Sequence, residues 1–194
     1  MNELELQKRL LDCLEQNLSL QTVLDRAEKL KMPNWYLGAG GITQTVWNIL
    51  HGFAPEYGIK DYDLVYFDAS DISYEAEDKI IQAGQALFAD CPIFVEIRNQ
   101  ARVHLWYEAH FGKKIAPHES VERAICSWPT TITAIGVRKI DEQFTIFSPF
   151  GLADLFNLIV RPNRELVSKE IYLNKVERWK KTWPKLTVLS WDEE

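Results

Sequence analysis

Residues 60–67, Lys-Asp-Tyr-Asp-Leu-Val-Tyr-Phe, constrain the fold of this chain more than any other stretch. Two carboxylates, Asp61 and Asp63, lead into an apolar and aromatic run of the kind that prefers β-strands. Side chains two positions apart on a strand share a face, with their Cα atoms roughly 7 Å apart. We therefore expect a strand with both carboxylates on one face and the apolar side chains of positions 62, 64 and 66 on the other.

Two carboxylates on one face of a strand suit a divalent cation. Like charges this close repel unless a positive charge lies between them, and hard oxygen ligands suit Mg²⁺ or Mn²⁺. The first hypothesis is therefore a metal platform on Asp61 and Asp63. The alternative is that both acids are simply solvated, as acids at strand edges and turns commonly are.

A glycine-rich turn precedes this strand. Residues 35–37 predict a short strand, Gly40 and Gly41 lie in the turn after it, and residues 42–50 resume helical periodicity. The first N–H groups of a helix lack partners and lie at the positive end of its dipole, so the turn can cradle phosphate. Thr43 and Gln44 could add side-chain hydrogen bonds.

Two other interpretations of the glycine turn stay open. The glycines can serve only a tight turn. They can also belong to a dinucleotide-binding turn, whose fingerprint includes an acidic residue about twenty positions later. Against this second alternative, Thr43 stands where the third glycine of the fingerprint belongs, and one ribose does not need a paired Asp-x-Asp.

Residues 93–105 alternate between apolar and polar side chains. The even positions from 96 onward are Glu96, Arg98, Gln100, Arg102 and His104. On one continuous strand, central in a mixed sheet, these side chains share a face that needs a partner or a ligand; the alternative is a solvated face. Glu96 is then a candidate third metal ligand, and Arg98 or Arg102 can contact a triphosphate. We interpret His104 as structural.

The remaining segments are predicted to be packing elements. Apolar spacing and turn residues predict helices over residues 3–17, 74–89, 106–111, 117–128 and 169–183, a helix capped by Ser19, a hairpin turning at Asp141 and Glu142, and a helix starting at Gly151. Trp179 and Trp183 form an (i, i+4) pair on the last helix. We assign this pair to the core and not to a base-stacking surface.

Length and composition bound the class of protein. At 194 residues with 46% hydrophobic residues, the chain fits one globular domain. A net charge of −6 argues against extended nucleic-acid binding, which needs clustered positive charge. Cys13, Cys91 and Cys126 are too far apart in sequence to suggest a disulfide framework or a zinc site. Neither a signal peptide nor a membrane-length apolar run is recognisable, so we expect a cytoplasmic protein without a membrane partner.

Three features succeed one another in the chain: the Gly40-Gly41 turn opening a helix, the Asp-x-Asp strand and Glu96. This order resembles the DNA polymerase β superfamily of nucleotidyltransferases, particularly the head domain of CCA-adding enzymes and poly(A) polymerases. More closely, the chain is similar to a family of small bacterial nucleotidyltransferase-like proteins of unassigned substrate. The motifs that carry this similarity are Gly40, Gln44-Thr45-Val46-Trp47-Asn48, Asp61-Tyr62-Asp63, Asn99-Gln100-Ala101-Arg102-Val103-His104, Pro149-Phe150-Gly151-Leu152-x-Asp154-Leu155 and Arg161-Pro162-Asn163.

The resemblance implies an α/β (α+β) nucleotidyltransferase fold, in which helices flank a small mixed β-sheet. We expect one domain over residues 1–194, with N-terminal helices in 1–32, the catalytic-type core in 33–150 and C-terminal helices in 151–194. Carried over residue by residue, the resemblance implies that Gly40 and Gly41 hold the phosphates of a nucleoside triphosphate. It implies that Asp61 and Asp63 bind the metal ions, and that Glu96 helps to activate an attacking hydroxyl.

The chain departs from the superfamily in its spacing. The gap between Gly41 and Asp61 is longer than usual, with residues 53–58 as an apparent insertion, and we expect no arm, body or tail domain like those of the tRNA-modifying enzymes. We expect a metal-dependent transferase that moves a nucleoside monophosphate from a nucleoside triphosphate to an unknown hydroxyl acceptor. The alternatives are a non-catalytic nucleotide-binding or regulatory module with the same fold, and an interaction module in which the glycines and acids are structural.

Overall fold

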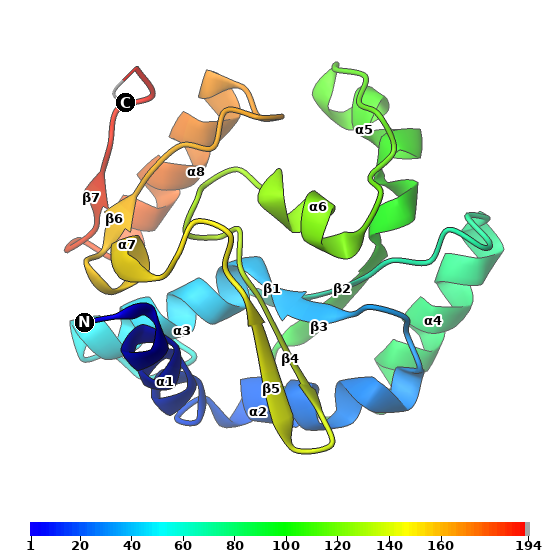
Figure 1. Ribbon diagram of the computed structural model, residues 1–194, viewed down its shortest axis with the longest axis horizontal. Coiled ribbons are helices and arrows are strands. Elements are labelled where there is room, and N and C mark those ends of the chain that lie inside the picture. The colour runs from blue at the N-terminus through cyan, green and yellow to red at the C-terminus, as the bar shows by residue number, and fades with distance from the viewer. Residues whose placement is uncertain (193–194) are drawn as a thin grey trace.

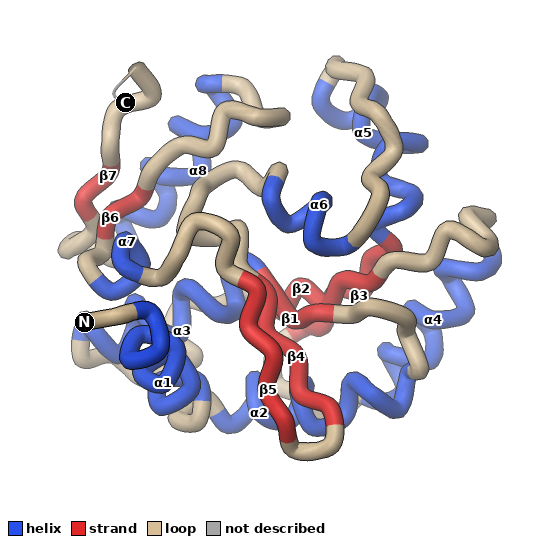
Figure 2. The backbone as a smooth tube through the Cα atoms, viewed as in Figure 1, coloured by secondary structure: helices blue, strands red, loops and turns tan. Residues whose placement is uncertain are grey.

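A five-stranded mixed sheet forms the centre of the molecule (Figure 1). In the computed structural model, which describes residues 1–192, its strands span Tyr36–Gly38 (β1), Asp61–Tyr66 (β2), Phe94–Asn99 (β3), Gly136–Ile140 (β4) and Gln143–Phe147 (β5). They lie in the order β3-β2-β1-β4-β5; β2 and β3 pair in parallel, and the other neighbours are antiparallel (Figure 2). The prediction of a small mixed sheet flanked by helices is confirmed.

Helices cover both faces of this sheet. The α-helices span Glu3–Leu14 (α1), Leu18–Ala27 (α2), Ala39–His51 (α3), Tyr74–Leu87 (α4), Val103–Phe111 (α5), Val121–Cys126 (α6), Ala153–Phe156 (α7) and Lys169–Thr182 (α8), and short 3-10 helices span Glu28–Leu30 (η1) and Gln100–Arg102 (η2). In Figure 1, α6 lies above the sheet and α2 lies below it. None of the helices in the described part of the chain is both long and apolar enough to cross a membrane.

Strand β2 separates two hydrophobic clusters, because its side chains alternate between the faces of the sheet. Tyr62, Leu64 and Tyr66 belong to the large cluster, which includes residues of α1, α2, α3 and α8. Val65 belongs to a smaller cluster, which Tyr36 and residues of α6 share. The strand and the predicted division of its two faces are therefore confirmed.

A buried polar group joins the N-terminal helices to β2. The Tyr62 hydroxyl lies 2.6 Å from Ser19 Oγ and 3.0 Å from Asn17 Oδ1. Asn17 Oδ1 also accepts a hydrogen bond from the Leu20 N–H, which makes Asn17 the N-cap of α2. The prediction that Ser19 caps this helix is wrong, since its hydroxyl lies against Tyr62 inside the first turn.

The C-terminal helix α8 packs its tryptophans into the large cluster. The rings of Trp179 and Trp183 each lie 5.2 Å from Trp47 of α3, centroid to centroid, and Trp183 Nε1 donates a hydrogen bond to Asn48 Oδ1 (2.6 Å). Assignment of this pair to the core is confirmed. Two short parallel strands nearby, Ile159–Val160 (β6) and Thr187–Val188 (β7), were not predicted, because two residues carry no periodicity.

The alternation of residues 93–105 does not mark one continuous strand. β3 ends at Asn99, whose side chain accepts a backbone hydrogen bond from the 3-10 helix η2 and caps it. The chain then turns into α5, so Gln100 and Arg102 leave the face of the strand. β3 is also an edge strand and not the predicted central neighbour.

Other predicted boundaries need smaller corrections. The hairpin turns at Asp141 and Glu142 as predicted, both with positive φ (47° and 63°). The helix predicted over 117–128 is shorter and begins only after Ser120, whose side chain caps it. The helix predicted from Gly151 begins at Ala153.

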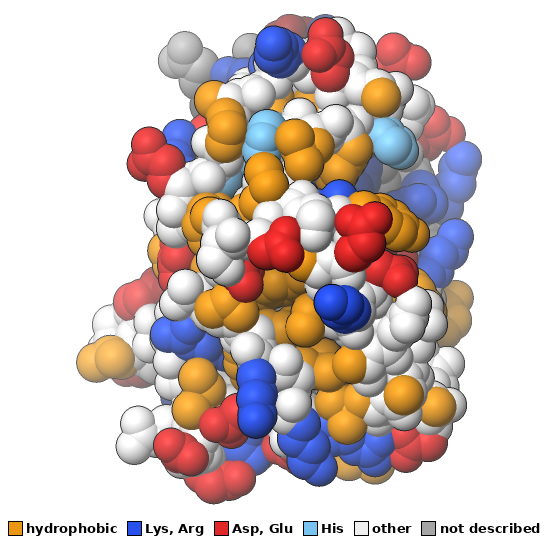
Figure 3. Space-filling view, turned by 90° about the vertical axis from the view of Figure 1, so that its right-hand side faces the viewer, with side chains coloured by type: hydrophobic (Ala, Val, Ile, Leu, Met, Phe, Trp, Pro, Cys, Tyr) orange, Lys and Arg blue, Asp and Glu red, His pale blue; other side chains and the backbone are white. Residues whose placement is uncertain are grey.

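Helix α5 leaves much of its apolar surface only partly buried. Only Val103 is buried along its length, although the helix also carries Leu105, Trp106, Tyr107 and Phe111. Seen from the side that carries α4 and α5, hydrophobic and histidine side chains gather over the upper part of the molecule (Figure 3). The apolar face of this helix is therefore incompletely covered.

Candidate active site

Three acidic side chains meet on one face of the sheet, beside the start of α3. Asp61 and Asp63 occupy alternate positions of β2, and Glu96 of β3 is the direct register partner of Asp63. Partners in a parallel pair point to the same face. The structure therefore brings together the three acids that the sequence singled out.

Electrostatics show that these acids share one environment. Burial, together with the charges of Asp61 and Glu96, raises the pKa of Asp63 to about 7, and Lys175 and Arg98 act in the opposite direction. Because mutual repulsion contributes to this pKa, a cation bound beside Asp63 would favour its ionised form. Without one, the carboxyl is partly protonated near neutral pH.

Two basic side chains border the acids. Arg98 Nε and Nη2 donate hydrogen bonds to Glu96 Oε1 at 3.0 and 2.7 Å. Lys175 comes from α8, and burial lowers its pKa while Asp63 raises it. The sequence analysis missed Lys175. The available signal was its place in the row Ile171, Lys175 and Trp179, where a lysine interrupts apolar residues spaced four apart on a helix.

The start of α3 lies next to the acids. Gly38, the last residue of β1, is the register partner of Asp63, and Ala39 comes next with a φ of 52°. Gly40 is partly exposed, and a Cβ added there would meet only the flexible amide of Gln44, 2.6 Å away. Helix N-terminal N–H groups are thus available beside the carboxylates.

Gly41 and Thr43 face the protein interior instead. A Cβ added to Gly41 would lie 2.6 Å from the Tyr62 ring, so this glycine allows α3 to approach β2 closely. Thr43 is fully buried, and its hydroxyl donates to the carbonyls of Ala39 and Gly40 at 3.3 and 3.4 Å. The structure therefore places the Thr43 side chain away from the surface that a phosphate could reach.

Arg102 also lies away from the acids. Its guanidinium forms an ion pair with Glu77 of α4, and its Nε donates to the Ile72 carbonyl (2.9 Å). Arg102 is absent from the cavity lining among the described residues, whereas Arg98 is part of it. The displacement follows from the end of β3 at Asn99, which removes Arg102 from the strand.

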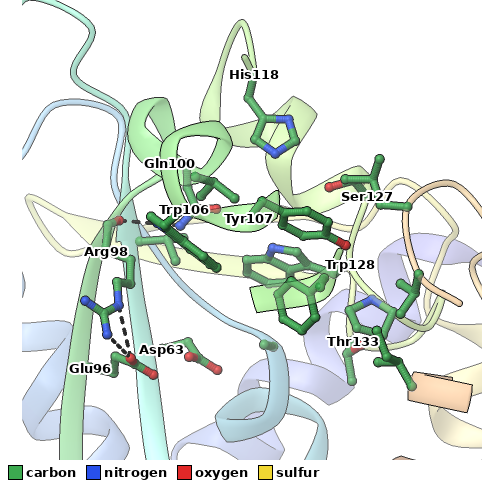
Figure 4. Close-up of a pocket in the computed structure, with 18 of the residues that line it drawn as sticks. Asp63, Glu96, Arg98, Gln100, Trp106, Tyr107, His118, Ser127, Trp128 and Thr133 are labelled. Carbon is green, nitrogen blue, oxygen red and sulfur yellow. Dashed lines mark hydrogen bonds and ion pairs between the residues drawn. The ribbon is translucent and has the colours of Figure 1, made fainter. Parts of the chain in front are cut away.

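A cavity of about 350 Å³ opens beside Asp63 and Glu96, and Asp61 is not among the described residues of its lining (Figure 4). Its charged end contains Asp63, Glu96, Arg98 and Lys175, with Ala39 beside them. Aromatic side chains line much of the rest of the cavity: Trp106, which lies beside Arg98 in Figure 4, and Tyr107, Phe111 and Trp128. A cavity of this size accommodates part or all of a small-molecule ligand.

The donor set suits a hard divalent cation, but it is not complete. Asp61 and Asp63 supply oxygen ligands from one face, whereas the Glu96 carboxylate is engaged by Arg98. Within residues 1–192, no group of three or more His, Cys, Asp or Glu side chains lies close enough to hold a metal ion. Mg²⁺ is commonly held by one or two carboxylates together with substrate phosphates. The two aspartates fit that pattern.

Comparisons with known proteins identify the family of this chain and agree with the resemblance found in its sequence. A family model described as "Nucleotidyltransferase" matches residues 25–188, and no match was found among curated proteins. A solved structure, described as an NMR structure that reveals a CCA-adding enzyme head domain, is similar to this chain at 25% identity, with a TM-score of 0.75. The similarity covers 94% of this chain and 95% of the other. The chain belongs to this nucleotidyltransferase family.

Proposed function

We propose that this chain transfers a nucleoside monophosphate from a nucleoside triphosphate to a hydroxyl acceptor, with Mg²⁺ or Mn²⁺ as cofactor. The observation that carries the proposal is the register of β2 and β3, which sets Glu96 beside Asp63 where the sheet borders the cavity and the start of α3. Family membership supports nucleotidyl transfer as the reaction class. The metal, nucleotide and acceptor are part of the proposal.

The phosphates bind at the N-terminus of α3 in this scheme. The backbone N–H groups of Gly40 and Gly41 belong to the first turn and have no intrahelical partners. The helix dipole favours an anion there. Gln44 lies against Gly40 and can donate an additional hydrogen bond. Arg98 and Lys175 add positive charge at the same end of the cavity.

Asp61 and Asp63 would hold the divalent cation beside the triphosphate. When bound, the cation supplies the positive charge that stabilises the charge developing on the phosphoryl group. The pKa of Asp63, raised by burial and by the charges of Asp61 and Glu96, supports this assignment, because a bound cation would relieve the repulsion among these acids.

Glu96 receives the proton of the acceptor hydroxyl. The acceptor oxygen forms a bond to the α-phosphorus, the bond from the α-phosphorus to the bridging oxygen breaks, and pyrophosphate leaves. The hydrogen bonds from Arg98 orient the Glu96 carboxylate at the edge of the cavity. The Thr43 and Arg102 side chains take no part, since both are engaged elsewhere.

Binding and turnover separate this proposal from the alternative of a non-catalytic nucleotide-binding or regulatory module. We expect ATP or CTP to raise the Tm only with Mg²⁺ present, and Asp61→Asn or Asp63→Asn to abolish that rise without unfolding the protein. Transfer of label from α-³²P-labelled nucleotide is then measured with short RNAs and small hydroxyl compounds as acceptors. Pyrophosphate release should accompany transfer and be lost in Glu96→Gln.

The possible outcomes differ clearly. Magnesium-dependent binding without transfer to any acceptor favours the non-catalytic module. A Tm that no nucleotide changes, with or without Mg²⁺, contradicts both the transferase and the nucleotide-binding module, and favours an interaction module with structural glycines and acids.

A further inference from the structure

The aromatic part of the cavity has no assigned role in the transfer chemistry. It is built largely by α5, whose Trp106 and Tyr107 are only partly buried and whose Phe111 is 46% exposed. The rings pack on one another, with the Tyr107 and Phe111 centroids 4.6 Å apart. An apolar helix face that the protein leaves uncovered, and that lines a cavity, is available to a ligand.

Trp128 connects this wall to the acids. A Cβ added to Gly38 would lie 2.7 Å from Trp128 Cη2, so the indole rests directly against the backbone of β1. Gly38 is also the register partner of Asp63. The Trp128 indole therefore packs on β1, the strand next to the one that carries Asp63. The aromatic and charged parts of the cavity form one continuous site (Figure 4).

Two polar side chains of the cavity, those of Tyr107 and Gln100, have hydrogen-bonding capacity that the described residues do not use. The Tyr107 hydroxyl forms no hydrogen bond with any residue among 1–192, and burial raises its pKa. Gln100 is only 6% exposed and lines the cavity, yet its amide donates just one long bond, 3.5 Å to the Arg98 carbonyl. Its side-chain oxygen accepts none from the described residues. The Gln100 amide therefore lines the cavity with an oxygen that is free to accept a hydrogen bond from a ligand.

We propose that the aromatic wall binds the nucleobase of the donor nucleotide, with its ring against Trp106 and Tyr107 and the Gln100 amide at its edge. This inference rests on the proposed function, because it takes the triphosphate to lie at the charged end. Nucleobases stack on aromatic side chains regardless of sequence, and a glutamine amide can both donate to and accept from a base edge.

Charge distribution favours a base over a second phosphate. The charged side chains Asp63, Glu96 and Arg98 lie together in the cavity, and Lys175 is close enough to Asp63 for their charges to interact (Figure 4). His118 lies at the far end, where burial and the charge of Arg123 lower its pKa, so that it is neutral at pH 7. A neutral, planar group attached to an anionic tail matches this arrangement.

The test compares ligands on the unmodified protein, by equilibrium dialysis in Mg²⁺ with ATP, CTP, inorganic tripolyphosphate, adenosine and cytidine. We expect the nucleotides to bind at least about tenfold more tightly than tripolyphosphate, the gain expected from stacking one base. Equal affinities would overturn the base site while leaving the phosphate site intact. Nucleosides that bind when tripolyphosphate does not would support the base site and contradict the proposed phosphate site. No binding by any of these ligands contradicts both.

Variants then locate the contact. Tyr107→Leu should reduce the advantage of ATP over tripolyphosphate by about fivefold or more, the lower end of one stacking contact, without weakening tripolyphosphate binding. Tyr74→Leu, which changes a 65% exposed tyrosine outside the cavity lining, is the matched control and should change neither affinity. An unchanged advantage in a folded Tyr107→Leu protein overturns the assignment of this wall.

Discussion

The two faces of strand β2 lie in different environments, one in the hydrophobic core and the other at the cavity. On one face, Tyr62 and Leu64 are fully buried, and the Tyr62 hydroxyl has two hydrogen-bond partners. On the other face, Asp61 is exposed and Asp63 is partly buried beside Glu96, a third negative charge. Neighbouring residues of one strand thus lie in the hydrophobic core and in a site where three acidic side chains repel one another.

The cavity face of β2 is therefore the less favourable of the two environments for the free energy of folding. A core polar group without a partner destabilises the fold, and the buried Tyr62 hydroxyl has its partners in Ser19 and Asn17. Like charges left together in a cavity are also unfavourable, and they persist where a ligand relieves them. The core face of β2 should therefore control folding, and the cavity face should control ligand binding. Substitutions on the two faces test that division.

The largest expected effect is on the core face. Leu64→Ala removes a fully buried side chain and leaves a cavity in the large cluster, which should destabilise the protein by about 2–5 kcal/mol. Urea unfolding followed by circular dichroism measures this change. A loss below about 1 kcal/mol would mean that the core side of β2 can collapse around the gap, and the division between the faces would weaken.

The next effect is on the cavity face. Asp63→Asn should lower nucleotidyl transfer by at least about 100-fold, since in the proposed mechanism it removes one of the two carboxylates that would hold the cation. The Tm should stay the same or rise, because the substitution also removes repulsion with Asp61 and Glu96. Asp25→Asn, which changes an exposed acid paired with Lys139 on the surface, is the control. A large fall in Tm for Asp63→Asn would contradict the comparison.

The sequence predicted this division because it depends on a local rule. Alternation along five or six residues places Asp61 and Asp63 opposite Tyr62 and Leu64 whatever the rest of the fold does. The same rule placed Glu96 correctly on β3. It failed beyond Asn99, where a side-chain cap ends the strand. Alternation carries no information about where a strand stops.

The aromatic wall and Lys175 could not be predicted in the same way. Trp106, Trp128 and Lys175 come from separate segments of the chain that meet only through the tertiary fold. Gly40 and Gly41 were also indistinguishable in sequence. Only the packing of Tyr62 shows that Gly41 serves the core and Gly40 borders the site.

Substitutions at the adjacent Gly40 and Gly41 test the same division between core and site, with a smaller expected change in stability. Gly41→Ala would place a methyl group 2.6 Å from the Tyr62 ring and should destabilise the protein by about 1–3 kcal/mol. Gly40→Ala meets only the Gln44 amide, which can move, so its Tm should stay close to that of the unmodified protein. Tripolyphosphate should nevertheless bind Gly40→Ala more weakly, because a Cβ obstructs its approach to the helix N-terminus. Equal Tm values for the two variants would contradict the separate roles.

The smallest expected effect lies at the far end of the cavity, where His118 titrates. Burial, followed by the positive charges of Arg123 and His104, lowers its pKa below 6.5, and Glu165 acts in the opposite direction. As the pH falls below 6.5, the unfolded chain binds a proton before the folded protein does, so stability is lost down to the folded pKa. His118→Gln should remove this part of the pH dependence of the Tm. The two proteins should differ by a constant amount above pH 7.5, where the imidazole is neutral in both states. A difference in Tm between the unmodified protein and His118→Gln that is also constant from pH 7.5 to 5 would mean that His118 is open to solvent. That result would also weaken the case for a nucleobase bound in this cavity.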